Sequence, residues 1–249
     1  MKYVFISLAV IVGCTVVYGI VEALIVKYNG TFVAAPDIPR APRTFGTGPK
    51  LTYVVMGDST SIGQGAEYKD SYAMQTAEHL AQEHTITLHN TGVSGARVQD
   101  LLTDQLPKAV ALKPDVVLLG IGANDTTHFT SLEQIQDAMQ KTIDSLRKAN
   151  PDVRIVATRS PALDSVSRFP PVSKFILKMR TAQVNKTFDT LIETNHITPA
   201  YIAEKTRDAF LADPTLTAVD NFHPNKQGYG LWIPILNSAL DTALEKTAT

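Results

Sequence analysis

Apolar and polar positions follow two different periods along the chain. Short apolar runs typical of buried strands occur at residues 51–56, 115–121 and 153–158, and residues 85–89 and 197–202 are also strand-like. Apolar residues recur at helical spacing within 71–83, 97–112, 132–148, 172–194 and 226–246. Because strands that alternate with helices form a parallel sheet covered on both faces, this pattern predicts a three-layer α/β/α sandwich with a mostly parallel sheet of about five strands.

A longer apolar run lies at the start of the chain, from Val4 to Val26, with Glu22 as its only charged residue. About 20 apolar residues are enough to cross a bilayer as a helix. The alternative is a cleaved signal peptide, whose apolar stretch usually has only about 7 to 15 residues. We therefore predict a transmembrane anchor over residues 1–27. Basic residues flank both ends of this segment, so the charge rule does not fix its orientation.

We expect the rest of the chain to be exported, because a very short tail before the span usually stays in the cytoplasm. Cleavage of the segment would instead give a secreted protein. Residues 28–50 contain four prolines among small and polar residues, a composition that resists packing and predicts an extended spacer. Residues 51–249 then form one folded domain, because this length does not require a second one.

Composition limits the classes of partner. Lys plus Arg number 23 against 24 Asp plus Glu, so no basic field favours nucleic acid, and we expect a small or neutral ligand. The single cysteine, Cys14, excludes an intrachain disulfide framework. His223 and Asp220 could each bind a metal, but no third ligand is spaced nearby, so we predict neither a metal nor a cofactor. The composition gives no indication of the oligomeric state.

Four polar loops can meet at one edge of the predicted sheet, where ligands bind in such folds. They are "GDSTSIG" at 57–63, "NTGVSGA" at 90–96, "GANDTTH" at 122–128 and "DNFHPN" at 220–225. Within them we interpret Asp58 and Asp125 as acids that brace loops. "GDSTSIGQG" lacks the lysine of a phosphate-binding loop, and the stretch "GQGAEY" lacks the third glycine of a dinucleotide fingerprint.

These loops contain the groups that nucleophilic catalysis needs. A serine hydroxyl is a poor nucleophile unless a base takes its proton, and an acid must hold that base in the correct tautomer. Ser59, His223 and Asp220 could fill these roles, because one tight turn would bring the carboxylate onto Nδ1 while Nε2 faces the serine. Attack on an ester carbonyl creates an oxyanion. The backbone amides of Ser59 and Gly95 and the side-chain amide of Asn124 are candidate donors to it.

Taken in order, the four blocks resemble those of the SGNH, or GDSL-type, serine esterases and lipases. The matching residues are Gly57-Asp58-Ser59, Gly95, Gly122-Ala123-Asn124-Asp125 and Asp220-Asn221-Phe222-His223-Pro224. The resemblance covers about residues 51–243 and implies the SGNH hydrolase fold with a flavodoxin-like sheet. Thr60 stands where many members carry leucine, a difference that does not touch the catalytic atoms.

The resemblance also implies a role for each matching residue. Ser59 would be the nucleophile, His223 the base and Asp220 the acid that orients it. The oxyanion hole would consist of Ser59, Gly95 and Asn124.

We therefore expect a hydrolase of carboxylic esters that works through an acyl-serine intermediate. Membrane tethering would suit lipid esters such as lysophospholipids, and the family resemblance equally permits acetyl esters of cell-surface glycans. Aromatic and aliphatic residues in the neighbouring loops could line an acyl slot: Phe129, Leu163, Phe169, Phe210 and Leu211. Two alternatives stay open: an acyltransferase that uses the same serine with a sugar hydroxyl as acceptor, and a non-catalytic binding module on the same fold.

Overall fold

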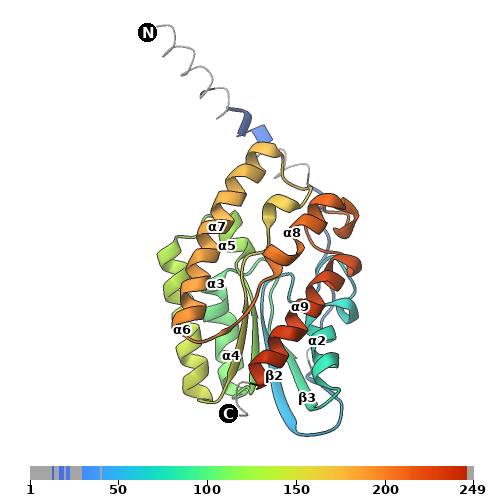
Figure 1. Cartoon of the computed structure of the whole chain (residues 1–249), viewed down its shortest axis with the longest axis vertical. Coiled ribbons are helices and arrows are strands. Elements are labelled where there is room, and N and C mark those ends of the chain that lie inside the picture. The colour runs from blue at the N-terminus through green and yellow to red at the C-terminus, as the bar shows by residue number, and fades with distance from the viewer. Residues whose placement is uncertain (1–12, 14–16, 20, 23–29, 40, 246–249) are drawn as a thin grey trace.

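The computed structural model describes residues 13, 17–19, 21–22, 30–39 and 41–245. A six-stranded sheet lies between two layers of helices, with strand order β1-β3-β2-β4-β5-β6 (Figure 1). The strands are β1 (Arg43–Phe45), β2 (Lys50–Gly57), β3 (Thr85–Asn90), β4 (Val116–Gly120), β5 (Arg154–Thr158) and β6 (Thr198–Ala200). Strands β2 to β6 run parallel, in the flavodoxin-like order. The predicted three-layer sandwich is thus confirmed.

The prediction of about five strands misses the edge strand. β1 runs antiparallel to β3, with Phe45 opposite Ile86, and it lies within the segment 28–50 that was expected to be a spacer. Three residues are too short for an alternating pattern to be visible in the sequence. Their backbone covers the otherwise open edge of β3, and an open edge is a liability in any sheet.

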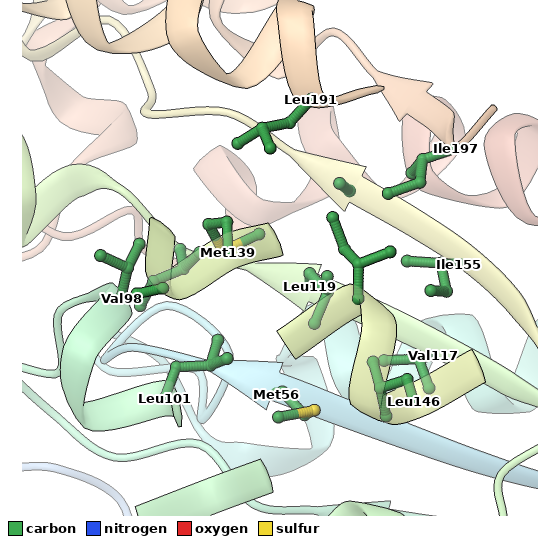
Figure 2. Close-up of a cluster of buried hydrophobic side chains, with 14 of the residues drawn as sticks. Met56, Val98, Leu101, Val117, Leu119, Met139, Leu146, Ile155, Leu191 and Ile197 are labelled. Atoms are coloured by element: carbon green, nitrogen blue, oxygen red, sulfur yellow. The ribbon is translucent and has the colours of Figure 1, made fainter. Parts of the chain in front are cut away.

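One face of the sheet is covered by α3 (Val98–Asp100), α4 (Leu106–Ala111), α6 (Leu132–Ala149) and α7 (Pro171–Thr194). Figure 2 shows this core, in which the strand residues Met56, Leu119 and Ile155 cluster with Leu146 and Leu191 of the helices. Helix α6 begins at a capping box, in which Ser131 and Gln134 each bond the other's backbone amide. Apolar residues at helical spacing therefore face alternating strand residues across a buried layer.

The other face is covered by α2 (Tyr72–Leu80), α8 (Ile202–Ala212) and α9 (Lys226–Glu245). Aromatic rings fill the space between α2 and α9: Tyr229 and Trp232 meet edge to face at 5.6 Å, and Tyr72 lies 6.4 Å from Tyr229. Short helical turns complete the connections: η1 (Tyr68–Asp70), η2 (Leu101–Gln105), α5 (Ala123–Thr127), η3 (Leu163–Ser165) and η4 (Pro214–Leu216).

The helix predicted over 97–112 is interrupted, because η2 is a π-helical turn between α3 and α4. Its buried Gln105 accepts a hydrogen bond from the Gly57 amide at 2.9 Å and donates one to the Gly57 carbonyl at 2.8 Å. β3 ends at Asn90, which pairs with Val55, and beyond this point the Gly57 carbonyl accepts hydrogen bonds from both Gln105 and the Val93 amide, the latter at 3.1 Å. A π-helical turn in this position satisfies backbone groups at the functional edge of the sheet.

The predicted transmembrane anchor, residues 1–27, lies mostly outside the described residues. Among the helices of the described parts, none is both long and apolar enough to cross a membrane. The carboxylate of Glu22, which belongs to the described residues, accepts hydrogen bonds from the amide and hydroxyl of Ser173 at 3.0 and 3.1 Å. This contact docks the residue on the first turn of α7, where free amides favour an anion.

Candidate active site

The turn that carries Ser59 begins directly after β2. A side chain at Gly57 would place its Cβ 2.2 Å from the Gly120 carbonyl oxygen, so only glycine lets β2 and β4 lie this close. Asp58 then folds the chain back, because its carboxylate accepts hydrogen bonds from the Thr60 amide at 2.9 Å and the Thr60 hydroxyl at 2.8 Å. Ser59 lies at the top of this turn, where only 6 % of its surface is exposed to solvent.

The turn that carries His223 is held by Asp220. One carboxylate oxygen accepts hydrogen bonds from the backbone amides of Phe222 and His223, both at 3.0 Å. The other lies 2.6 Å from Nδ1 of His223. Asn221 has φ +56°, a left-handed conformation that asparagine tolerates better than most residues. The imidazole orientation is thus set by the same carboxylate that shapes the backbone.

The structure brings the three predicted catalytic side chains together in series. Nε2 of His223 lies 2.9 Å from the hydroxyl oxygen of Ser59, although the two residues are 164 positions apart. Gly65 permits this approach, because a Cβ there would lie 2.9 Å from the Cβ of His223 and 2.4 Å from the Pro224 carbonyl oxygen. With Nδ1 donating to Asp220, Nε2 is free to accept the serine proton.

The electrostatics of the two acids differ. Burial on its own would raise the pKa of Asp220, but hydrogen bonds from the His223 ring and from the amides of Phe222 and His223 outweigh it and lower this pKa. Asp220 therefore stays ionised beside the imidazole. Burial raises the pKa of Asp58 to about 6, and the hydrogen bonds from Thr60 offset only part of that effect.

The predicted oxyanion donors are placed less directly. Asn124, in α5, lines the same cavity as Ser59 and His223, and its Nδ2 donates to the Ala96 carbonyl at 3.0 Å. Gly95 lies in the neighbouring loop with φ +81°. It immediately precedes Ala96, whose carbonyl accepts the hydrogen bond from Asn124. Among the described residues, the amides of Ser59 and Gly95 donate no hydrogen bond, so both remain available to a ligand.

A small cavity of about 30 Å³ opens beside Ser59 and His223. Its apolar lining includes the following residues: Ala162, Leu163, Val166, Phe210, Phe222 and Trp232. Of the residues expected in an acyl slot, Leu163 and Phe210 do line the cavity, whereas Phe129 and Leu211 are 56 % and 42 % exposed. Phe169 instead packs edge to face on Phe222, with ring centroids 5.8 Å apart.

Titratable residues outside the proposed triad have structural contacts. The fully buried Asp125 accepts a hydrogen bond from the Val98 amide at 3.1 Å, which agrees with its interpretation as a bracing acid. His79 lies 2.8 Å from Asp241 across α2 and α9, a pair that sequence reasoning did not find. In the described part of the chain, no three His, Cys, Asp or Glu side chains are grouped so that they could hold a metal ion.

Sequence reasoning missed three further residues near the site. Gln105 supports Gly57 as described above, and Gln64 and Arg168 contact the two catalytic turns. None of them belongs to a motif, and a polar side chain that bonds distant backbone leaves no periodic signal in the sequence.

Comparisons with known proteins identify a family for this sequence and similar folds among solved structures. The sequence model of the GDSL-like lipase/acylhydrolase family matches residues 55–231. The structure of TesA has 16 % identity and a TM-score of 0.64, and the match covers 77 % of this chain and 99 % of that chain. An extracellular lipase from Streptomyces rimosus has 19 % identity and a TM-score of 0.62, and the match covers 76 % of this chain and 99 % of that chain.

The psychrotrophic esterase EstA from Pseudoalteromonas sp. has 16 % identity and a TM-score of 0.61, with 78 % of this chain and 98 % of that chain covered. At these identities the structural likeness concerns the fold alone. No curated protein matches the chain at a significant level.

Asp58 provides a test of the electrostatics at the nucleophile turn. Because its folded-state pKa of about 6 lies above the ordinary value of 3.8, folding favours the protonated form. Its contribution is therefore complete below about pH 4 and is lost as pH rises to about 6. We expect Asp58→Asn to gain stability relative to the wild type over this range, by up to about 3 kcal/mol. Urea denaturation at pH 4 and pH 7 measures the difference.

Asp213 is a matched control, because it makes the same bonds to the amide and hydroxyl of Thr215 but is exposed. Those bonds lower its pKa, so Asp213→Asn should lose stability relative to the wild type as pH rises. A constant difference between wild type and Asp58→Asn from pH 4 to 7 would contradict the raised pKa.

Proposed function

Because the chain belongs to the GDSL-like lipase/acylhydrolase family, we propose that it hydrolyses carboxylic esters through an acyl-serine intermediate on Ser59. The observation that carries this proposal is the series of short contacts from Ser59 Oγ to His223 Nε2, at 2.9 Å, and from His223 Nδ1 to Asp220 Oδ2, at 2.6 Å. A hydroxyl, an imidazole and a carboxylate in this order form an activated nucleophile.

In the proposed reaction, Ser59 Oγ attacks the ester carbonyl carbon while His223 takes the hydroxyl proton. The tetrahedral intermediate collapses as the imidazolium gives that proton to the leaving alkoxide, which departs as the alcohol. A water molecule then attacks the acyl-serine, with His223 again as base, and releases the carboxylic acid. Asp220 stays ionised throughout and stabilises the imidazolium, in keeping with its lowered pKa.

We assign the oxyanion of each tetrahedral intermediate to the amides of Ser59 and Gly95 and the side chain of Asn124. Two observations support this assignment: the two backbone amides have no acceptor among the described residues, and Asn124 lines the cavity beside Ser59. Fixed neutral donors of this kind stabilise developing charge without reorganising during the reaction.

The cavity beside Ser59 is a suitable place for the acyl group of an ester, because it opens next to both Ser59 and His223. Its lining is mostly apolar, as an acyl methyl requires.

The same acyl-enzyme could pass its acyl group to a sugar hydroxyl, which would make the protein an acyltransferase. A purely binding role would give no reason for the aligned hydroxyl, imidazole and carboxylate.

We further propose that residues 1–27 anchor the protein in a membrane and that the catalytic domain is extracytoplasmic. Support comes from the apolar run between Val4 and Val26. Membrane fractionation of cells that express the full chain should leave the protein in the pellet after a carbonate wash, and protease added to intact cells or spheroplasts should digest the domain. Recovery of the full-length chain in the soluble fraction would contradict the anchor.

Ser59→Ala should abolish hydrolysis, because no other described hydroxyl lies within hydrogen-bonding distance of His223 Nε2. We expect turnover of p-nitrophenyl acetate to fall by about 10⁴-fold or more, with an unchanged melting temperature. A fluorophosphonate should label the wild type and not this variant. Ser61→Ala is the control, since Ser61 lies in the same turn but its hydroxyl donates to the Asp58 carbonyl. Labelling of Ser59→Ala would place the nucleophile elsewhere.

Asn124→Ala should leave a slow enzyme. Loss of one oxyanion donor lowers kcat by about 10² to 10³-fold, while KM changes little because the donor acts mainly in the transition state. Asn150→Ala is a suitable control, because Asn150 follows α6 and its side chain bonds Pro114 in the connection that leads to β4, at the opposite edge of the sheet. Wild-type kcat in Asn124→Ala would remove this residue from the oxyanion hole.

A further inference from the structure

A short segment before the family domain contacts both sides of the candidate active site. We call residues Thr31, Phe32 and Val33 the N-terminal strap. Nη1 of Arg168 donates to the Thr31 carbonyl at 2.9 Å and to the Asp220 carbonyl at 3.2 Å. The guanidinium carbon of Arg168 also lies 5.2 Å from the centre of the Phe32 ring, within cation–π distance. One side chain therefore connects the strap to the residue that orients His223.

A second connection leads from the strap to the opposite side of the site. Nε2 of Gln64 donates to the Val33 carbonyl at 2.7 Å. Oε1 of Gln64 accepts from the hydroxyl of Ser94 at 2.6 Å, and Ser94 immediately precedes Gly95. The backbone amide of Gln64 donates to the Ser59 carbonyl at 3.0 Å. The buried Gln64 thus joins the strap to the nucleophile turn and to the loop that carries a proposed oxyanion donor.

Gln64 and the His223 turn differ in their other contacts with the domain. The carbonyl of Gln64 accepts a hydrogen bond from the buried Tyr229 hydroxyl at 2.8 Å, so Gln64 is fixed from the core as well. The turn that carries His223 is a surface turn, and its Val219 is 75 % exposed. Arg168 holds this turn twice, because its backbone amide also donates to the Asn221 carbonyl at 2.9 Å. Hydrogen bonds within the turn shape it, including those from the Ala218 amide to the His223 carbonyl at 2.8 Å and from the Asn221 amide to the Ala218 carbonyl at 2.9 Å. Arg168 adds the connection between this turn and the strap.

We propose that the strap is a positioning element of the active site, with Arg168 as its positioning residue. It fixes the His223 turn relative to the Ser59 turn and the Ser94–Gly95 loop, so that the catalytic unit includes residues ahead of the family domain, which begins at residue 55. Catalysis is sensitive to such placement, because a displacement of about 1 Å can cost about 100-fold in rate. This inference rests on the proposed ester hydrolysis.

The test uses the full chain and p-nitrophenyl acetate. Arg168→Gln removes both bonds of Nη1 and the cation over Phe32. We expect kcat to fall by about 10- to 100-fold and KM to change by less than about 2-fold, because placement of the base affects the chemical step. Arg168→Lys keeps the charge over the ring and should recover part of the loss. Arg43→Gln is the control, since Arg43 lies over Phe45 at 5.5 Å on the edge strand β1 and does not contact the catalytic turn.

Phe32→Ala tests the strap itself and should not affect folding, because Phe32 is 78 % exposed. It should lower kcat less than Arg168→Gln does. In the double variant Phe32→Ala/Arg168→Gln, kcat should be no lower than in Arg168→Gln alone, because both changes break one connection. Multiplying effects in the double variant, or wild-type kcat in both single variants, would overturn the positioning role. Wild-type protein that neither turns over the ester nor reacts with a fluorophosphonate would instead refute the proposed function.

Discussion

The 2.9 Å contact between Ser59 and His223 joins the turn after the first parallel strand to the turn before the last helix. It exists only because two backbones approach closely at positions without side chains. Gly57 lets β2 lie against Gly120 of β4, and Gly65 lets the nucleophile turn lie against His223. The parallel sheet brings the loops to one edge, but these glycines set the last few ångströms, on which proton transfer depends.

Several polar groups at this edge lie in a largely buried environment and are compensated locally. Asp220 has backbone amides and the imidazole as partners, and Asp58 has both donors of Thr60. Gln105 satisfies both backbone groups of Gly57 where β3 has already ended. Buried polar groups without partners would cost several kcal/mol. The same bonds that avoid this cost also fix the orientation of the catalytic groups, so stability and function here share one set of contacts.

Much of this arrangement could be predicted from the sequence, because its signals are local. The strands β2, β4 and β5 are largely buried and therefore appear as apolar runs. The turns after β2 and β4 contain recognisable motifs with glycine, serine and asparagine, and the histidine motif lies in the turn before α9. The edge strand β1 was missed because three residues carry no period. Gln105, Gln64 and Arg168 were missed for another reason: each bonds backbone atoms far away in the sequence, and a backbone acceptor places no constraint on the identity of its residue.

The same reason explains how a segment of unremarkable composition can contribute to the proposed active site. The strap offers carbonyl oxygens at Thr31 and Val33, which almost any residue could supply, while the specific donors lie on the domain as Arg168 and Gln64. A family comparison that begins at residue 55 therefore cannot reveal the strap, although its donors lie within the matched region. The docking of Glu22 on Ser173 extends the same attachment toward the N-terminus. The contacts of Glu22 with Ser173 and of Arg168 with the carbonyls of Thr31 and Asp220 therefore attach the part of the chain ahead of the family domain at two places, and the second of these lies on the turn that carries the proposed base.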